Sequence, residues 1–249
     1  MKISEVIGKV VAFHPPIDEH HTSDVVKIGD TDRDCTGIVT CCFPSVEVIR
    51  KTAELGANLI IAHEPLFWTD SDKTEWLQGS ELFEAKKNLL EDAGIAVWRD
   101  HDHIHGGPPS NNPPAVDGIY YGIMKELGWE EYKIAYPNKP LLFKIPEIDA
   151  TEFGLQLKEK LGLNGIRILG DPHTKVSTVF LCEHITDHGW HEQEKMLQIE
   201  RDSIDAVIPL EIVDWSIPAF IRDAASLGSP KILYNVGHFN FEELGMKYL

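Results

Sequence analysis

The sequence lacks the features that mark membrane, secreted and nucleic-acid-binding proteins. No apolar run reaches the roughly 18 residues that a membrane-spanning helix needs, and the first residues, MKISEVIGKVVAFHPP, lack the apolar core and cleavage site of a secretory signal. Basic residues are scarce, because 23 Lys and Arg stand against 40 Asp and Glu and leave a formal net charge of −17. A surface that binds nucleic acid or an anionic membrane needs Lys and Arg to neutralise phosphates. We therefore expect a cytoplasmic protein with no nucleic-acid partner and no membrane.

Cysteine is also scarce, and several well-known motifs are missing. The 4 cysteines form no Cys-x-x-Cys pair, which disfavours a Cys-rich zinc site and favours buried thiols in a reducing compartment. The chain contains neither the GxxxxGK[ST] phosphate loop nor the GxSxG turn of a serine hydrolase. Histidine, in contrast, is frequent, with 12 residues. The positions of these histidines relative to the expected strands carry most of the functional information.

Apolar runs with the length of strands alternate along the chain with segments of helical periodicity. The expected strands occupy residues 36–42, 57–64, 95–98, 141–145, 165–169, 175–183, 206–210 and 231–237. The expected helices occupy residues 45–55, 80–93, 119–128, 151–161, 191–201, 217–227 and 238–249. Such alternation predicts an α/β fold with mainly parallel sheets. We expect one module over 1–249 with two linked subdomains, at about 1–130 and 138–249, joined by the polar, Pro-containing segment 130–140.

Three polar clusters follow expected strands directly, at the edge where parallel sheets bind their ligands. His63 and Glu64 follow ANLIIA, the polar loop HDHIH at 101–105 follows the strand IAVW, and His238 and Glu242 follow KILYNVG. His238 and Glu242 are four residues apart and share one face of a helix. Imidazole and carboxylate groups suit Zn, Fe, Mn or Co. Together the clusters predict a metal site, although each alone is compatible with a solvated loop, a surface histidine tract or a helix-start pair.

Other histidines give weaker signals. Three of them follow the expected strand 175–183 with a spacing that fits one helix face, and are His184, His188 and His191. Because Gly189 weakens such a helix, they are only a secondary hypothesis for a second metal or a substrate element. Three more lie in a polar, Pro-containing loop, where we expect them to be solvated, and are His14, His20 and His21.

The clusters resemble the motifs of a known family. GANLIIAHEPLFW resembles the signature Gly-Ala-Asp-Leu-Ile-Ile-x-His-His-Pro-Leu-Phe of the Nif-three-like family, also labelled the GTP cyclohydrolase 1 type 2 family. GHFNFEELGMKYL resembles its C-terminal motif, in which a Glu follows the His of a Gly-His pair by four residues. HDHIH stands where the family has His-Thr-Asn-Leu-Asp. With the block LLFKIPEIDATEFGLQLKEKLGLNGIRILGD and the segment VIPLEIVDWS, the resemblance extends from about residue 36 to the end.

This resemblance implies two linked α/β subdomains without the inserted domain of some members, and a centre with two divalent metal ions per chain, which we expect to be Zn, Fe or Mn. Matched position by position, the implied metal ligands are His63, Glu64, His105, His238 and Glu242. Glu64 replaces the second His of the family's motif, and His105 replaces its Asp. The C-terminal motif at 237–245 then returns to the metal site of the first subdomain. The family also implies a toroidal homo-oligomer, which we expect to be a homohexamer.

The implied function is that of a metal-dependent hydrolase, which acts on a small substrate such as a nucleotide or a phosphorylated compound through a metal-bridged hydroxide. Three residues are candidates for a catalytic proton relay, namely His101, Asp102 and His103. His101 is also a candidate outer ligand. The alternative is a non-catalytic metal-binding scaffold, metal carrier or regulatory interaction protein. A barrel hydrolase with His-x-His near its first strand fits less well, because HDHIH follows about the third expected strand.

Overall fold

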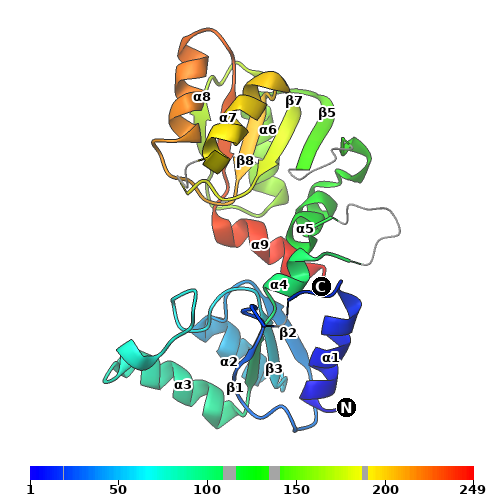
Figure 1. The fold of residues 1–249 in the computed structure, drawn as a ribbon, viewed down its shortest axis with the longest axis vertical. Coiled ribbons are helices and arrows are strands. Elements are labelled where there is room, and N and C mark those ends of the chain that lie inside the picture. Colours follow the sequence, from blue (N-terminus) through cyan, green and yellow to red (C-terminus); the bar gives the residue numbers. More distant parts are fainter. Residues whose placement is uncertain (19, 109–115, 135–140, 187–189) are drawn as a thin grey trace. The chain divides into compact units, whose positions relative to one another are not determined.

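The computed structural model describes residues 1–18, 20–108, 116–134, 141–186 and 190–249. Contacts divide the chain into two compact units, of which the first comprises 1–122 and 242–249 and the second 123–241 (Figure 1). The division crosses two helices, α5 (Gly118–Leu127) and α9 (His238–Lys247). The sequence placed the connection later, at 130–140, and residues 135–140 of that segment lie outside the described part of the chain.

The first unit is built on a four-stranded sheet with the strand order β1-β4-β3-β2. Its strands are β1 (Val26–Ile28), β2 (Ile38–Cys41), β3 (Leu59–Ala62) and β4 (Ala96–Arg99). Its other elements are α1 (Ile3–Phe13), α2 (Val46–Glu54), η1 (Glu75–Leu77), α3 (Glu81–Ala93), α4 (Asp102–His105) and parts of α5 and α9. Strands β2, β3 and β4 are parallel, and β1 is an antiparallel edge. Figure 1 shows α2 and α3 on one side of this sheet and α1 on the other.

Local sequence explains where these helices begin and end. The side chain of Ser45 accepts a hydrogen bond from the backbone N–H of Val48 at 3.2 Å and caps α2, and Ser80 caps α3 in the same way. Helix α3 ends at Gly94, whose φ of 61° lies in the left-handed region that glycine adopts at little cost. Strand β3 is buried along its whole length, as its continuous apolar run predicts.

The second unit is built on a five-stranded sheet with the order β5-β7-β8-β9-β6. Its strands are β5 (Leu141–Asp149), β6 (Arg167–Gly170), β7 (Lys175–Cys182), β8 (Ala206–Pro209) and β9 (Ile232–Asn235). Its other elements are η2 (Glu130–Tyr132), α6 (Ala150–Lys160), α7 (Trp190–Arg201), α8 (Ile217–Ser226) and the remaining parts of α5 and α9. Strands β7, β8 and β9 are parallel, whereas β5 and β6 are antiparallel edges.

Alternating side chains divide the core of the second unit between the two faces of its sheet. Leu233 of β9 belongs to an apolar cluster that contains Ile199 of α7 and Ile221 of α8. The next residue, Tyr234, contacts α6 instead, because its hydroxyl donates to the carbonyl of Ala150 at 2.6 Å. Helices therefore cover both faces, and the parallel strands between them are almost entirely buried.

The predicted fold class is confirmed, since the chain is a mixed α/β protein with two sheets. Three features differ from the expectation. Helix α1 was not predicted, and the segment HDHIH, expected as a polar loop after a strand, forms the helical turn α4. Each sheet also has antiparallel edge strands beside its parallel centre. Among the helices within the described residues, none has the length and apolar composition needed to cross a membrane.

Candidate metal centre

His63 and Glu64 lie directly after β3, at the carboxyl edge of the first sheet. The backbone N–H of His63 donates to the carbonyl of Cys41 at 3.1 Å, and that of Glu64 donates to the carbonyl of Cys42 at 2.7 Å. These bonds continue the pairing of β2 with β3 and fix the backbone of both residues. The side chain of His63 is completely buried.

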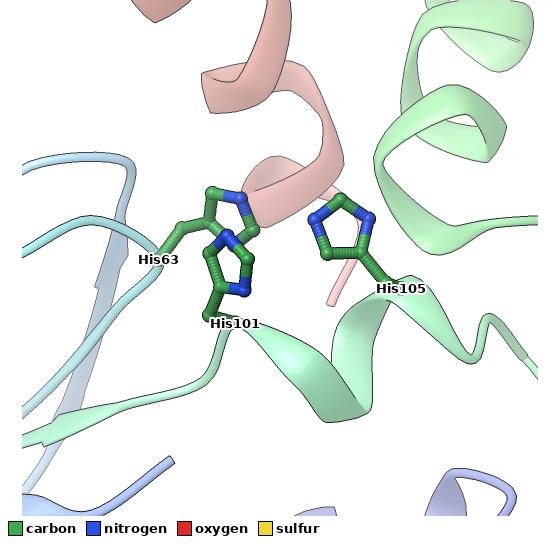
Figure 2. Close-up of side chains that lie close together, drawn as sticks. All are labelled: His63, His101 and His105. Atoms are coloured by element: carbon green, nitrogen blue, oxygen red, sulfur yellow. The ribbon is translucent and has the colours of Figure 1, made fainter. Parts of the chain in front are cut away.

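The adjacent strand β4 brings two further histidines to the same edge. The backbone N–H of Asp100 donates to the carbonyl of Ala62 at 2.8 Å, so the chain after β4 stays beside the end of β3. The rings of His63 and His101 stack with their centroids 4.6 Å apart. His105 lies edge-on to both rings, at 5.1 Å from His63 and 4.8 Å from His101. Figure 2 shows these three imidazoles gathered at one place, as the strand-end argument predicts.

Each of the three imidazoles is oriented through its Nδ1 atom. Nδ1 of His63 is 3.2 Å from the carbonyl oxygen of Asp100. Nδ1 of His101 is 2.8 Å from Oδ1 of Asp102, and Nδ1 of His105 is 2.8 Å from Oδ2 of Asp117. Because these partners only accept hydrogen bonds, Nδ1 carries the proton in each ring and Nε2 keeps the lone pair. Metal-binding histidines have this arrangement, in which an oxygen holds the N–H and fixes the ring.

Two carboxylates complete the group. Oε2 of Glu242, on α9, lies 3.4 Å from Nε2 of His63, and both side chains are at most 1% exposed. Glu64, His63 and Glu242 offer ligand atoms within 4.8 Å of one another, and so do His63, His101 and His105. Glu64 also lies 3.6 Å from Nη2 of Arg99. We call His63, Glu64, His101, His105 and Glu242 the metal centre.

The donor atoms of the metal centre fit a divalent cation. Nε2 of His63 is buried and, among the residues that the structure describes, makes no hydrogen bond. A buried polar atom without a hydrogen bond costs about 1–3 kcal/mol. A cation between this lone pair and the Glu242 carboxylate removes that cost and compensates the buried negative charge. Imidazole nitrogen with carboxylate oxygen is a donor set that suits Zn, Fe or Mn.

Burial and hydrogen bonds determine the protonation states of His101 and Asp102. Burial lowers the pKa of His101, and the neighbouring His63 lowers it further. Burial raises the pKa of Asp102, but hydrogen bonds from His101, from the backbone of Ser23 and from Thr22 outweigh this and hold the pKa well below its usual range. At neutral pH the pair is therefore a neutral imidazole that donates to a carboxylate.

His103 belongs to a different group, although it is part of the same motif. Its Nδ1 is 2.7 Å from Oδ2 of Asp24, and these two residues with Asp100 offer ligand atoms within 4.8 Å of one another. We call Asp24, Asp100 and His103 the buried Asp-Asp-His group. Burial, helped by the charge of Asp24, raises the pKa of Asp100 to about 7. The expectation for His14 was wrong, because this residue is only 8% exposed and its Nδ1 contacts the carbonyl of Gly107.

The second unit has its own cluster at the carboxyl edge of its sheet. His184, Glu211 and His238 follow β7, β8 and β9 respectively. The two oxygens of Glu211 lie 3.0 Å from Nδ1 of His184 and 3.3 Å from Nδ1 of His238. His188 lies outside the described residues, and His191 is exposed at the start of α7. Among the described residues of this secondary hypothesis, His184 belongs to the cluster, and the hypothesis itself stays a prediction.

The structure thus brings together four of the five predicted metal ligands, namely His63, Glu64, His105 and Glu242, within the first unit. The fifth, His238, belongs to the second unit, and its place in the centre stays a prediction. Of the predicted proton relay, His101 and Asp102 lie at the metal centre, whereas His103 contacts Asp24. The roles of all eight residues stay predictions.

Sequence reasoning missed the residues that orient these histidines. Glu211 directly follows the expected strand 206–210, so the strand-end rule that found His63 also indicates it. Asp24 and Asp117 lie in irregular segments and carry no comparable signal, because their partners are determined by long-range folding.

Comparisons with known proteins agree with this architecture. A model of the family described as Duf34/NIF3 (NGG1p interacting factor 3) matches residues 1–249. A Clostridium perfringens protein named GTP cyclohydrolase 1 type 2 homolog is 22% identical over 248 residues, which cover 97% of this chain and 87% of that protein. A Staphylococcus aureus protein of the same name is 24% identical over 168 residues, which cover 67% of this chain but only 42% of that protein.

Solved structures show the same fold. A Bacillus cereus protein related to NIF3 has a TM-score of 0.71 at 12% identity, and the match covers 100% of this chain and 91% of that protein. Staphylococcus aureus protein SA1388 has a TM-score of 0.67 at 18% identity, with 100% and 89% covered. At such identities the likeness supports the two-sheet fold, and within the described residues no inserted domain is evident.

Proposed function

Because the chain belongs to the Duf34/NIF3 family, we propose that its metal centre binds divalent cations and hydrolyses a small phosphorylated or nucleotide substrate. The observation that carries this proposal is the set of three histidines with Nδ1 held by oxygens, beside the buried pair of His63 and Glu242. We propose two cations per chain, of Zn, Fe or Mn. His238 is the further ligand that the family motif predicts.

The exposure of the centre differs between its two sides. The His63 and Glu242 side chains are at most 1% exposed, whereas those of His101 and His105 are 31% and 29% exposed. We propose that the buried pair anchors the cations and that the more exposed side, which carries His101 and His105, faces the substrate. A bound divalent cation lowers the pKa of a coordinated water from ~16 towards ~7 and stabilises negative charge that develops on the substrate.

His101 is suited to carry the proton that hydrolysis releases. Asp102 fixes the proton on Nδ1 of His101 at 2.8 Å, so Nε2 keeps a lone pair and can accept a proton. Asp102 is itself held by the hydroxyl of Thr22 at 2.8 Å and by the backbone N–H of Ser23 at 2.9 Å. We propose that Asp102 positions His101 and that His101, which lies at the metal centre without binding a cation, accepts the proton at Nε2.

A phosphorylated substrate is consistent with the charge of the chain only if cations mediate its binding. The formal net charge is −17, so the surface as a whole repels phosphate. The name of the Clostridium perfringens relative, GTP cyclohydrolase 1 type 2 homolog, makes GTP the first compound to test. Cyclic nucleotides and phosphate esters are the next.

Metal analysis of protein purified without an affinity tag tests whether the chain binds divalent cations, which both the hydrolase and the scaffold functions require. We expect the metal centre to contribute about two ions per chain in the wild type and fewer in His63→Ala, with no change in His21→Ala. His21 is a suitable control because its side chain is 84% exposed and, within the described residues, forms an ion pair with Asp18 alone. A wild-type content below one ion per chain would reject the metal centre.

A hydrolysis screen with the metal-loaded protein tests catalysis. Turnover of GTP, a cyclic nucleotide or a phosphate ester should fall strongly in His63→Ala and in His101→Ala, and should persist in His21→Ala. Turnover that does not respond to either variant would indicate a contaminant. Full metal content without any turnover would instead support the scaffold or carrier function.

The oligomeric state is a separate proposal, which rests on the family resemblance alone. We propose a homohexamer, whose mass would be six times the 28.0 kDa of one chain. Light scattering of the metal-loaded protein measures this mass directly. A monomer would contradict the proposal without affecting the metal centre.

A further inference from the structure

The buried Asp-Asp-His group lies inside the first unit, and the proposed hydrolase does not use it. The side chains of Asp24 and His103 are 0% and 2% exposed, and Asp100 is 0% exposed. Their ligand atoms lie within 4.8 Å of one another. Two carboxyl groups therefore share a space from which water is excluded, where like charges repel strongly.

Asp24 is held firmly by its surroundings. Its Oδ1 accepts hydrogen bonds from the backbone N–H groups of His101 and Asp102, both at 2.8 Å. Its Oδ2 accepts from the backbone N–H of His103 at 2.8 Å and from Nδ1 of the same residue at 2.7 Å. These bonds place a carboxylate and an imidazole in a fixed frame, with the lone pair of His103 on Nε2.

The carboxyl group of Asp100, in contrast, is not held by such a set of hydrogen bonds. Within the described part of the chain, neither of its buried carboxyl oxygens has a hydrogen-bond partner at ordinary distance and angle, although the backbone N–H of Ile104 is near enough to lower its pKa slightly. Its backbone is fixed on both sides, because its N–H donates to Ala62 and its carbonyl accepts from His63. The side chain is therefore held in place with two unsatisfied oxygens beside a second carboxylate. No Lys or Arg of the described residues pairs with Asp24 or Asp100 in a recorded ion pair.

Two simpler arrangements, a proton on Asp100 or a bound water molecule, stabilise these carboxyl groups less well than a cation does. A proton on Asp100 removes one charge but creates an O–H group that also needs an acceptor. A single water molecule can donate to both oxygens but leaves both negative charges uncompensated. A divalent cation bonds to the Asp100 oxygens and compensates both carboxylates at once.

We propose that Asp24, Asp100 and His103 form a second, buried binding site for a divalent transition-metal cation, separate from the metal centre. Carboxylate oxygens with one imidazole nitrogen suit Mn²⁺, Fe²⁺ or Zn²⁺. Because all three side chains are at most 2% exposed, the site offers no face to a substrate and is structural. The cation links the segment before β1 to the segment after β4, which includes His101 and His105.

Metal stoichiometry tests this proposal independently of the metal centre. Tag-free wild type, Asp100→Asn, His63→Ala and the double variant are equilibrated with Mn²⁺ or Zn²⁺, dialysed and analysed by mass spectrometry. Asp100→Asn should hold one ion per chain fewer than the wild type, and His63→Ala should keep the ion that Asp100→Asn loses. Equal metal contents of wild type and Asp100→Asn would overturn the proposal. Loss of ions in His63→Ala alone would leave the metal centre as the sole site.

A second measurement keeps the test decisive if Asp100→Asn does not fold. In His63→Ala, Mn²⁺ at less than one equivalent should give the electron paramagnetic resonance signal of bound rather than aqueous Mn²⁺. The same addition should raise the melting temperature of His63→Ala measured after treatment with a chelator. An entirely aqueous signal from folded His63→Ala would overturn the proposal. If instead the wild type binds only the ion that Asp100→Asn loses, the proposed hydrolase centre fails and the buried site stands.

Discussion

Asp24 is a buried residue whose replacement should strongly lower the stability of the first unit. Its carboxylate accepts hydrogen bonds from the backbone of three consecutive residues, 101–103, and from the imidazole of His103. All four donors lie at the start of α4, which has no side-chain cap of its own. We expect Asp24→Asn to destabilise the metal-free protein strongly and to loosen α4.

The magnitude follows from counting donors that lose an acceptor. The amide of Asn keeps one oxygen, which can serve either the pair of donors at Oδ1 or the pair at Oδ2. The NH₂ group then faces the other two N–H groups, and each buried donor without an acceptor costs about 1–3 kcal/mol. The expected loss in the free energy of unfolding is therefore about 2–6 kcal/mol, a large part of the 5–15 kcal/mol that is typical of a domain.

Urea unfolding measures this loss. It is carried out in the presence of a chelator, with tryptophan fluorescence as the signal. Asp32→Asn is a matched control, because the Asp32 side chain is 80% exposed and, among the described residues, its one ion pair is with exposed Lys2. Exposed ion pairs of this kind contribute little to stability. Amide hydrogen exchange should also quicken at residues 101–103 in Asp24→Asn. A free energy of unfolding within about 0.5 kcal/mol of the wild type, the scatter of ordinary surface changes, would refute the reasoning.

Three further predictions concern substitutions of single residues in the first unit. Asp117→Asn should weaken Zn²⁺ binding by about 10–100-fold in titration calorimetry, because Asp117 orients the ring of His105. In chelator, the wild type should lose stability as the pH rises from about 4 to 7, and Asp100→Asn should not. Burial raises the pKa of Asp100 to about 7, so the folded state keeps a proton that the unfolded chain releases near pH ~4, a difference of at most about 4 kcal/mol. Gly118→Ala should cost about 1–3 kcal/mol in urea unfolding, because its Cβ would stand 2.4 Å from a backbone oxygen.

Each of these predictions has a contrary result. Wild-type Zn²⁺ affinity in Asp117→Asn would show that His105 does not bind the cation or does not depend on its carboxylate partner. Parallel curves of stability against pH for wild type and Asp100→Asn would show that the Asp100 carboxyl is ionised in the folded state at no cost. A Gly118→Ala protein as stable as the wild type would show that the start of α5 shifts freely.

The sequence predicted most elements of the fold because buried parallel strands have an unmistakable pattern. The runs at 57–64 and 206–210 are apolar without alternation, and both became strands covered on both faces, β3 and β8. The run at 57–64 also located the metal centre, since it ends in His63 and Glu64 at the carboxyl edge of the sheet. Helix α1 was missed although Ile3 and Val6, its buried residues, have helical spacing. That signal was present and would have predicted the helix.

Other features of the site had no local signal. Asp24 is separated from its partners by 77 to 79 positions, and nothing in the surrounding sequence indicates that it caps α4. The antiparallel edge strand β1 is short and pairs with a strand far along the chain. In both cases long-range contacts determine the structure, and a reading based on local pattern has no access to them.

The motif His-x-His-x-His shows how one long-range contact determines which side chains of a segment lie on the same face. In an extended segment, residues 101, 103 and 105 would point to the same side and offer three ligands to one ion. Because Asp24 turns the segment into the helical turn α4, His101 and His105 are one turn apart and share a face, while His103 lies on another. The rings of His101 and His105 contact His63, and His103 contacts Asp24. His103→Gln should therefore leave the ions of the metal centre in place and remove the ion of the buried Asp-Asp-His group, whereas His105→Gln should do the reverse.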